Sequence, residues 1–247
     1  MTLAARTAAP SKIASLQALR TRIVSCRCCP ELRRYCADIA RVRKREFISE
    51  TYWGRPVPSI GRSDARVLIV GLAPAAHGGN RTGRMFTGDG SAAWLAPALH
   101  ATGFATQPTS THRDDGFALI DAFMTAAIRC APPKNKPTPR QIANCSGHMQ
   151  AELDLLTRMR VVVGLGKIGF DIIYDRVRER GYATAGTRRP KFTHGAEYEL
   201  ATPGGATITL LGSYHPSRQN TNTGKLTLAM LRSVFARARE LLDRAGD

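Results

Sequence analysis

Arg66-Val-Leu-Ile-Val-Gly-Leu72 runs directly into Ala73 and Pro74. Short, continuous aliphatic and β-branched runs that end at glycine or proline are typical of strands buried on both faces. Three more runs share this composition, and each ends in a loop signal: residues 124–128, 160–165 and 207–214. The sequence therefore predicts four short strands in a sheet that is covered on both sides.

Helical patterns separate these strands. Apolar residues recur at helical spacing in residues 11–24, and similar patterns cover four later segments: 92–101, 139–158, 168–180 and 224–242. Strand–helix alternation indicates a parallel sheet flanked by helices. We expect an α/β fold, namely a three-layer α/β/α sandwich around a four-stranded, mostly parallel sheet. The chain is expected to form one domain over residues 1–247, with a frayed start at 1–11.

The charge balance is strongly basic. Lys and Arg number 36 against 19 Asp and Glu, which gives a net charge of +17. Such an excess attracts polyanions, nucleic acid first, because each neutralised phosphate releases counterions; an arginine-rich source proteome is the other explanation. Basic side chains are concentrated in residues 22–45, which form either a solvated helix face or a phosphate-facing surface.

No apolar run reaches the roughly 18 residues of a membrane span, and no signal peptide is visible. We therefore expect a cytoplasmic protein, and we expect it to be a monomer.

The loops after the strands carry the chemistry-bearing residues, and parallel strands place such loops along one edge of a sheet. The first loop, residues 71–89, holds five glycines, the aromatic Phe86 and finally Asp89. Asp89 precedes a predicted helix, so it is either an N-cap or a catalytic carboxylate. His215 follows the last strand directly, where a catalytic role and an incidental one are equally consistent with the pattern. The polar stretch 217–222 behind it can contact phosphates.

Taken together, these loops resemble the signature motifs of the uracil-DNA glycosylase superfamily, and the type B (family 5) branch in particular. Residues 71–89 resemble its first motif, and His215-Pro-Ser opens its second. Residues 52–58 and 129–137 add further similarity, so the resemblance runs from about residue 26 to residue 226. Leu72 and Ala73 stand where better-known uracil glycosylases have a water-activating Asn or Asp.

The resemblance implies a monofunctional DNA-repair glycosylase that flips uracil, or another deaminated base such as hypoxanthine, out of DNA and leaves an abasic site. A carboxylate near the sugar stabilises positive charge or orients water, and a histidine stabilises the departing base. Which of these two tasks Asp89 performs stays open. The implied catalytic residues are Asp89, His215 and Asn135, and the implied base-binding residues are Gly71, Leu72, Ala73 and Phe86. The implied contacts to DNA, double-stranded or single-stranded, are Arg81, Lys134, Ser217, Arg218, Gln219 and Asn220.

Four of the six cysteines lie in two distant segments: Cys26, Cys29, Cys130 and Cys145. In a chain without an export signal, metal ligation or reduced thiols are expected rather than disulfides. Spacing alone does not separate zinc from an iron–sulfur cluster. The resemblance implies a 4Fe–4S cluster on these four. Cys28 and Cys36 are then surplus, although Cys28 can take the place of Cys29; buried thiols without metal are the alternative.

Two rival interpretations remain at this point. Gly164-Leu-Gly-Lys-Ile-Gly169 is a complete G-x-G-x-x-G pattern after a predicted strand, which suggests a dinucleotide-binding oxidoreductase. The acidic residue expected about 20 positions later is absent, and an Arg188-Arg189 pair that suits a 2′-phosphate stands there. The second rival is a non-catalytic module that binds damaged DNA through the same fold.

Overall fold

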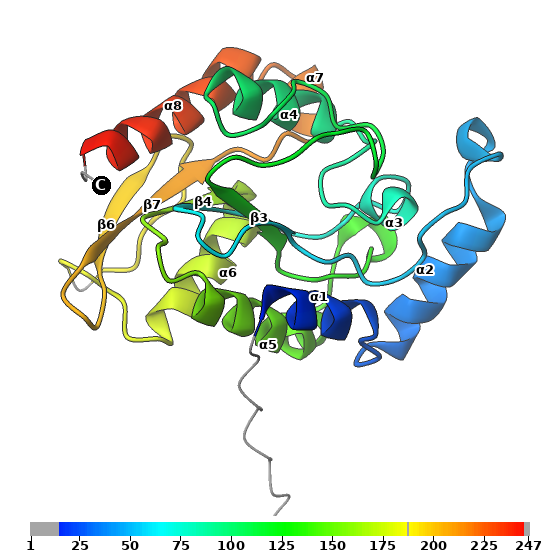
Figure 1. Ribbon diagram of the computed structural model, residues 1–247, viewed down its shortest axis with the longest axis horizontal. Helices are drawn as coiled ribbons and strands as arrows, with labels where there is room; N and C mark the ends of the chain where they lie inside the picture. The colour runs from blue at the N-terminus through cyan, green and yellow to red at the C-terminus, as the bar shows by residue number, and fades with distance from the viewer. Residues whose placement is uncertain (1–14, 187, 245–247) are drawn as a thin grey trace, which may run out of the picture.

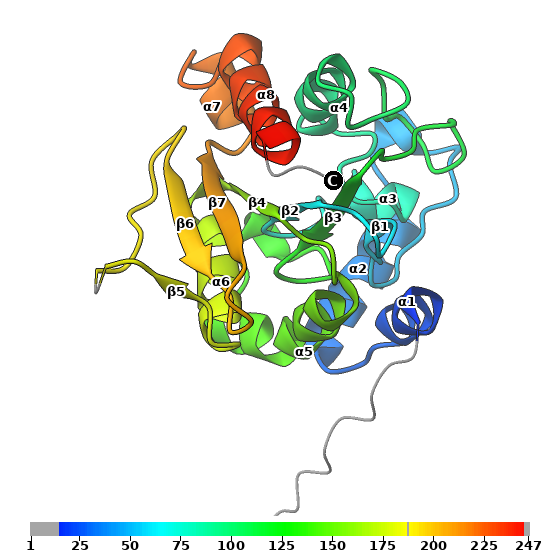
Figure 2. The ribbon, with the colours of Figure 1, turned by 60° about the vertical axis from the view of Figure 1, so that its left-hand side comes forward.

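The computed structural model describes residues 15–186 and 188–244, so the frayed segment expected at 1–11 lies outside the described residues. Helices cover both faces of a central sheet, with α4 and α8 on one side and α5 and α6 on the other (Figures 1 and 2). The predicted α/β sandwich is therefore confirmed. The helices are α1 (Leu16–Val24), α2 (Pro30–Val42), α3 (Gly79–Thr82), α4 (Ala92–Ala101), α5 (Pro139–Leu155), α6 (Gly166–Arg178), α7 (Arg218–Asn222) and α8 (Leu228–Arg244), with 3₁₀ turns η1 (Arg45–Phe47) and η2 (Pro133–Asn135).

The sheet has seven strands in the order β1-β3-β2-β4-β7-β6-β5. The four predicted strands form its parallel centre: β2 (Val67–Gly71), β3 (Ala122–Ala126), β4 (Val161–Leu165) and β7 (Thr207–Ser213). The predicted strand number was wrong, because three antiparallel strands extend the two edges: β1 (Ile60–Gly61), β5 (Ala183–Thr184) and β6 (Glu197–Ala201). Edge strands lack the continuous apolar run that marks a doubly buried strand.

Capping side chains explain where two of the helices begin. Ser15 caps α1, and its side chain accepts a hydrogen bond from the N–H of Ala18 at 3.2 Å. Thr138 starts α5 with a reciprocal capping box, in which Thr138 and Gln141 each bond the other's backbone N–H. The basic segment 22–45 contains α2, which begins with Pro30 in its first turn.

The G-x-G-x-x-G pattern is explained by packing. A Cβ at Gly164 would lie 2.5 Å from the Cα of Phe170, and one at Gly169 would lie 2.9 Å from the carbonyl oxygen of Val70. Glycine at these two positions lets the first turns of α6 approach the strands closely. Close helix–strand packing therefore accounts for these residues without a bound dinucleotide.

The core has two halves, one on each face of the sheet. One half packs α4 and α8 against the sheet, and the other packs α5 and α6 against its opposite face. Within the described ranges 15–186 and 188–244, no helix is long and apolar enough to cross a membrane.

Candidate active site

Three strand ends bring Phe86 and His215 together. A Cβ on Gly71, the last residue of β2, would lie 2.6 Å from Cζ of Phe86, so the ring of Phe86 sits directly on this strand end. His215 follows β7, and its ring centroid lies 6.0 Å from that of Phe86. Gly166, the first residue after β4, has a φ of +79°, and a Cβ there would lie 3.1 Å from Cβ of His215. These glycines leave the room that the two rings occupy.

Phe86 is held in an unusual backbone conformation, with a φ of 47°. A non-glycine residue in this region is strained and persists only where its surroundings hold it in place. The hydroxyl of Ser110 donates to the carbonyl oxygen of Phe86 at 3.1 Å. Arg84, two residues earlier, reaches Ser110 at 3.0 Å and pairs with Asp115 at 2.8 Å. This buried network fixes the first loop and the backbone of Phe86.

Asp89 caps the start of α4 from two residues before the helix's N-cap residue, Ser91, and also keeps an oxygen free. Its Oδ1 accepts hydrogen bonds from the backbone N–H groups of Ser91 at 3.0 Å and Ala92 at 2.9 Å. Its Oδ2 lies against Gly78, where a Cβ would come within 2.1 Å, and has no hydrogen bond to the described residues. Burial raises the pKa of Asp89, although the two backbone donors oppose this. Capping and catalysis are thus compatible, because each uses a different carboxylate oxygen.

His215 is neutral at physiological pH. Burial lowers the pKa of its imidazole to about 4. The carbonyl oxygen of His215 accepts from Nδ2 of Asn220 and from the N–H of Ser217, both at 2.8 Å. In the described part of the chain the ring nitrogens have no partner. The backbone is therefore fixed while the ring stays available to a ligand.

The residues expected to contact DNA occupy different environments. Arg218 and Gln219 are exposed at the start of α7, and Arg218 lies over Gly90, where a Cβ would be 3.2 Å from its Nε. Ser217 is the N-cap of α7, while Asn220 turns inward to hold His215. Lys134 is exposed in η2.

Arg81 lies in a different place from the expected DNA contact. Its side chain is only 5% exposed, and it donates to the carbonyl oxygens of His77 at 2.8 Å and Gly88 at 2.7 Å. It also pairs with Glu50, and its guanidinium stacks on the ring of Phe47 at 3.9 Å. Its donors are occupied by the protein, so Arg81 braces the first loop from within.

Asn135 lies in the loop after β3 and is exposed, with a φ of 55°. This loop runs beside the first loop, because Ala127 and Ile128 donate to the carbonyl oxygens of Gly71 and Leu72 at 2.9 and 3.1 Å. The side chain of Asn135 makes no hydrogen bond to the described residues, so its place in the base pocket stays a prediction. Leu72 itself and its neighbour in the first loop, Ala73, are partly buried.

One small cavity is lined by five cysteines, two arginines, and apolar and amide side chains; the cysteines are Cys26, Cys28, Cys29, Cys130 and Cys145. The cavity joins α2 and the preceding turn to the loop after β3 and to α5. Burial raises the pKa of Cys145 to about 12, and the pKa of Cys29 is raised for the same reason. Among the described residues, no three such side chains surround a single point as metal ligands do. Cys36 lies outside this lining, and its thiol approaches the carbonyl oxygen of Ala131 at 3.6 Å.

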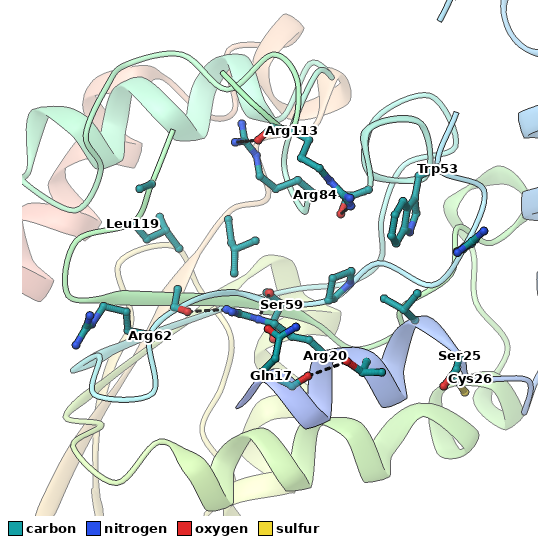
Figure 3. Close-up of a pocket in the computed structure, with 18 of the residues that line it drawn as sticks. Gln17, Arg20, Ser25, Cys26, Trp53, Ser59, Arg62, Arg84, Arg113 and Leu119 are labelled. Atoms are coloured by element: carbon teal, nitrogen blue, oxygen red, sulfur yellow. Dashed lines mark hydrogen bonds between the residues drawn. The ribbon is translucent and has the colours of Figure 1, made fainter. Parts of the chain in front are cut away.

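A large cavity lies elsewhere and was not predicted. It is a groove of about 980 Å³ between α1 and the loop 113–119, and Trp53 lies at one end of it (Figure 3). Its lining comes from four separate parts of the chain, residues 17–33, 53–62, 83–84 and 113–119. Basic composition in residues 22–45 was the only sequence signal for this surface.

Comparison with known proteins agrees with this geometry. The family model described as "Uracil DNA glycosylase superfamily" matches residues 58–239. A type-5 uracil-DNA glycosylase of Thermus thermophilus is 47% identical over 219 residues, which cover 89% of this chain and 94% of that protein. Those of Pyrobaculum aerophilum and Mycobacterium tuberculosis are 45% and 44% identical, and the alignments cover 88% and 92% of this chain and 89% and 82% of those proteins. The chain belongs to the uracil-DNA glycosylase superfamily.

Proposed function

We propose that the chain hydrolyses the N-glycosidic bond of uracil in DNA and leaves an abasic site. The observation that carries this proposal is the placement of Phe86 and His215 side by side at the ends of β2 and β7, together with an Asp89 that keeps one oxygen free at the start of α4. The relatives named type-5 uracil-DNA glycosylase match nearly the whole chain. A second deaminated base such as hypoxanthine belongs to the proposal, as does a monomeric enzyme that acts on duplex DNA.

The three side chains divide the chemistry. Phe86 stacks on the flipped base, since a base must leave the duplex before its glycosidic bond can be reached. The neutral imidazole of His215 donates a hydrogen bond to a carbonyl oxygen of the base and stabilises the negative charge that develops there. Oδ2 of Asp89 faces the positive sugar and the incoming water. Water adds its hydroxyl to C1′, the C1′–N bond breaks, and the proton leaves with the base or the carboxylate.

A uracil-containing oligonucleotide tests the proposal. After incubation with the protein, alkali cleaves the strand wherever an abasic site has formed. We expect scission with the wild-type protein and a loss of about 10²-fold or more in Asp89→Asn. Tight binding to the same oligonucleotide without any abasic site would instead indicate a non-catalytic module. A panel that includes hypoxanthine, in single and double strands, measures the substrate range.

We also propose that Cys26, Cys29, Cys130 and Cys145 hold a 4Fe–4S cluster. The donor set supports this, because thiol groups share one cavity whose other lining residues include Leu32 and Ile128 and no Asp or Glu. Two pairs of free thiols lie within hydrogen-bonding reach of one another: Cys26 with Cys28 inside the cavity, and Cys130 with Cys36, which lies outside its lining. Rotation about χ1 moves a sulfur between staggered positions and can break these pairs. The 4Fe–4S cluster would link the N-terminal helices α1 and α2 to the loop after β3.

Iron and acid-labile sulfide analysis of aerobically and anaerobically purified protein tests the cluster. We expect about four irons per chain for a 4Fe–4S cluster, together with a charge-transfer absorbance that Cys145→Ala removes. Cys36→Ala is the matched control and should retain the iron, since Cys36 does not line the cavity. Stoichiometric zinc in place of iron would contradict the proposal.

A further inference from the structure

The groove beside α1 is separate from the reaction site. We call it the arginine groove: it is bounded by residues 17–27 on one side and by residues 113–119 on the other (Figure 3). It lies on the β1 side of the sheet, and Phe86, Asp89 and His215 are not among its lining residues. The proposed reaction does not use this cavity, so we ask which ligand it could bind.

All the charged side chains that line the groove are positive. Among the residues that the structure describes, seven arginines and no Asp or Glu line the groove. Two of them are neutralised by carboxylates just outside it, since Arg62 and Arg84 pair with Asp64 and Asp115, each at 2.8 Å. The other five have no ion pair within the described residues. Clustered cations repel one another, so the arrangement favours an anionic ligand.

The most accessible cations surround an aromatic ring. Arg55 and Arg113 are exposed and lie over the ring of Trp53, with their guanidinium carbons 5.7 and 4.0 Å from its centroid. Arg27 also lines the groove, is exposed, and has no hydrogen-bond partner in the described structure. Guanidiniums interleaved with a half-buried aromatic ring are typical of surfaces that bind single-stranded nucleic acid.

The shape fits a strand rather than a single phosphate. Helix α1, which forms one wall, has nine residues and is therefore about 14 Å long. The groove and the candidate active site share the first loop, because Gly83 and Arg84 line the groove and the same loop carries Phe86. Arg113 donates to the carbonyl oxygen of Gly83 at 2.8 Å and joins the two regions.

We propose that the arginine groove binds the sugar–phosphate backbone of a DNA strand where this strand extends, unpaired, beyond the damaged nucleotide. Phosphates meet the guanidiniums, and Trp53 offers a face on which a base can stack. The inference rests on the proposed function, because the strand in the groove continues the one whose base enters the pocket. Such a contact favours damage near strand ends, gaps and unpaired flanks.

Binding of undamaged oligonucleotides, measured by fluorescence anisotropy, tests the groove without turnover. A blunt duplex is compared with the same duplex carrying a single-stranded extension at either the 5′ or the 3′ end. For the wild type, one extension should tighten binding about tenfold. In Arg27→Ala/Arg55→Ala this gain should vanish, and the slope of log K against log salt should shrink by about 1.4, at roughly 0.7 per phosphate contact.

The control is Arg178→Ala/Arg232→Ala, which removes two exposed arginines of α6 and α8 that do not line the groove. It should keep the extension-dependent gain. The chain has two tryptophans, so in Trp94→Phe the extension should quench the fluorescence of Trp53 alone. This optical readout does not depend on activity.

The results separate the groove from the catalytic proposal. No gain from either extension, or equal behaviour of the groove variant and its control, overturns the groove inference. Binding of poly-glutamate but not of single-stranded DNA, lost in the groove variant, overturns it in favour of a protein partner. Uracil release from the blunt duplex is measured in parallel. If that release is absent, the proposed function itself fails, whatever the extensions do.

Discussion

At the scale of single residues, Asp89 combines two tasks that substitution can separate. Asparagine caps a helix as well as aspartate does, since its side-chain oxygen also accepts backbone N–H bonds. We therefore expect Asp89→Asn to change the free energy of unfolding by less than about 0.5 kcal/mol and to slow base release by about 10²-fold or more. Asp89→Ala should lose the cap as well, at about 1 kcal/mol. Thermal unfolding and single-turnover kinetics measure the two effects.

The pH dependence of the rate follows from the raised pKa of Asp89. The proposed chemistry needs the carboxylate, so the rate should rise with pH through a midpoint above the ordinary value for a carboxyl group. In Asp89→Asn this limb should disappear. If the pH–rate profile of the wild type has its midpoint at or below the ordinary pKa of a carboxyl group, Asp89 is not the buried carboxylate on which the rate depends.

His215 should leave no inflection near neutral pH. Its pKa is lowered to about 4, so the imidazole stays neutral from about pH 5.5 upward. His215→Ala removes one donor to the leaving base and should lower the single-turnover rate by about 10² to 10³-fold. His215→Asn keeps an N–H donor and should lose less. An inflection near pH 6.5 that His215→Ala abolishes would show that the cation, not the neutral ring, takes part.

Residue identity alone predicted part of this site. Asp89 and His215 could be named because they follow apolar strands and sit in long loops that match known motifs. Arg81 could not be placed, because an arginine in a polar loop is usually exposed and nothing in the sequence shows that Glu50 and Phe47 enclose it. The position of Phe86 over Gly71 likewise depends on a strained backbone that only the fold reveals.

At the scale of elements, the first loop depends on the buried pair of Arg84 and Asp115, whose side chains are each 7% exposed. Removing one partner of a buried pair leaves the other uncompensated, so Asp115→Asn should lower the free energy of unfolding by about 3 kcal/mol near pH 7. Backbone N–H groups and Arg84 lower the pKa of Asp115 in the folded chain. The Asp115 carboxylate therefore stabilises the folded chain fully at pH values above its pKa in the unfolded chain, about 3.9. This contribution is lost as the pH falls through the lower pKa of Asp115 in the folded chain.

Denaturant titrations at several pH values measure this effect. The difference between wild type and Asp115→Asn should shrink steadily below about pH 4. Asp114→Asn is the matched control, since Asp114 is the exposed neighbour and has no ion pair in the described structure. Equal losses in the two variants, or a difference that persists in acid, would exclude the buried pair as the brace of the loop.

The central strands were predictable and the edges were not. β2, β3, β4 and β7 are buried along nearly all their length, so their sequences are mainly apolar or β-branched runs and contain no charged residue. Strand β6 is mostly exposed and reads Glu-Tyr-Glu-Leu-Ala, which contains no such run. The other two edge strands have two residues each, which is too short for any periodicity. The adjacent strands of the sheet determine where these edge strands pair, and the composition of the edge strands themselves does not.

At the scale of the whole molecule, the cysteine cavity links segments that lie about a hundred residues apart in sequence, from Cys29 to Cys130. A cross-link over such a loop restricts the unfolded chain and stabilises the folded one by up to about 4.7 kcal/mol in the entropic model. Helix α1 buries Leu19 and Ile23 within nine residues, whereas α2 buries the same number, Leu32 and Cys36, within thirteen residues and is therefore the less firmly packed of the two. Loss of the proposed cluster should therefore loosen α2 first.

Limited proteolysis with mass spectrometry measures this order of release. Chelation of the iron, or Cys29→Ala, should expose cleavage sites around residues 25–50 while the sheet between residues 60 and 240 remains resistant. The melting temperature should fall at the same time, because a link present only in the folded state has been removed. Cys36→Ala should change neither the iron content nor the sites of cleavage. Uniform cleavage throughout the chain after chelation would mean that the cluster supports the whole core rather than the attachment of α2.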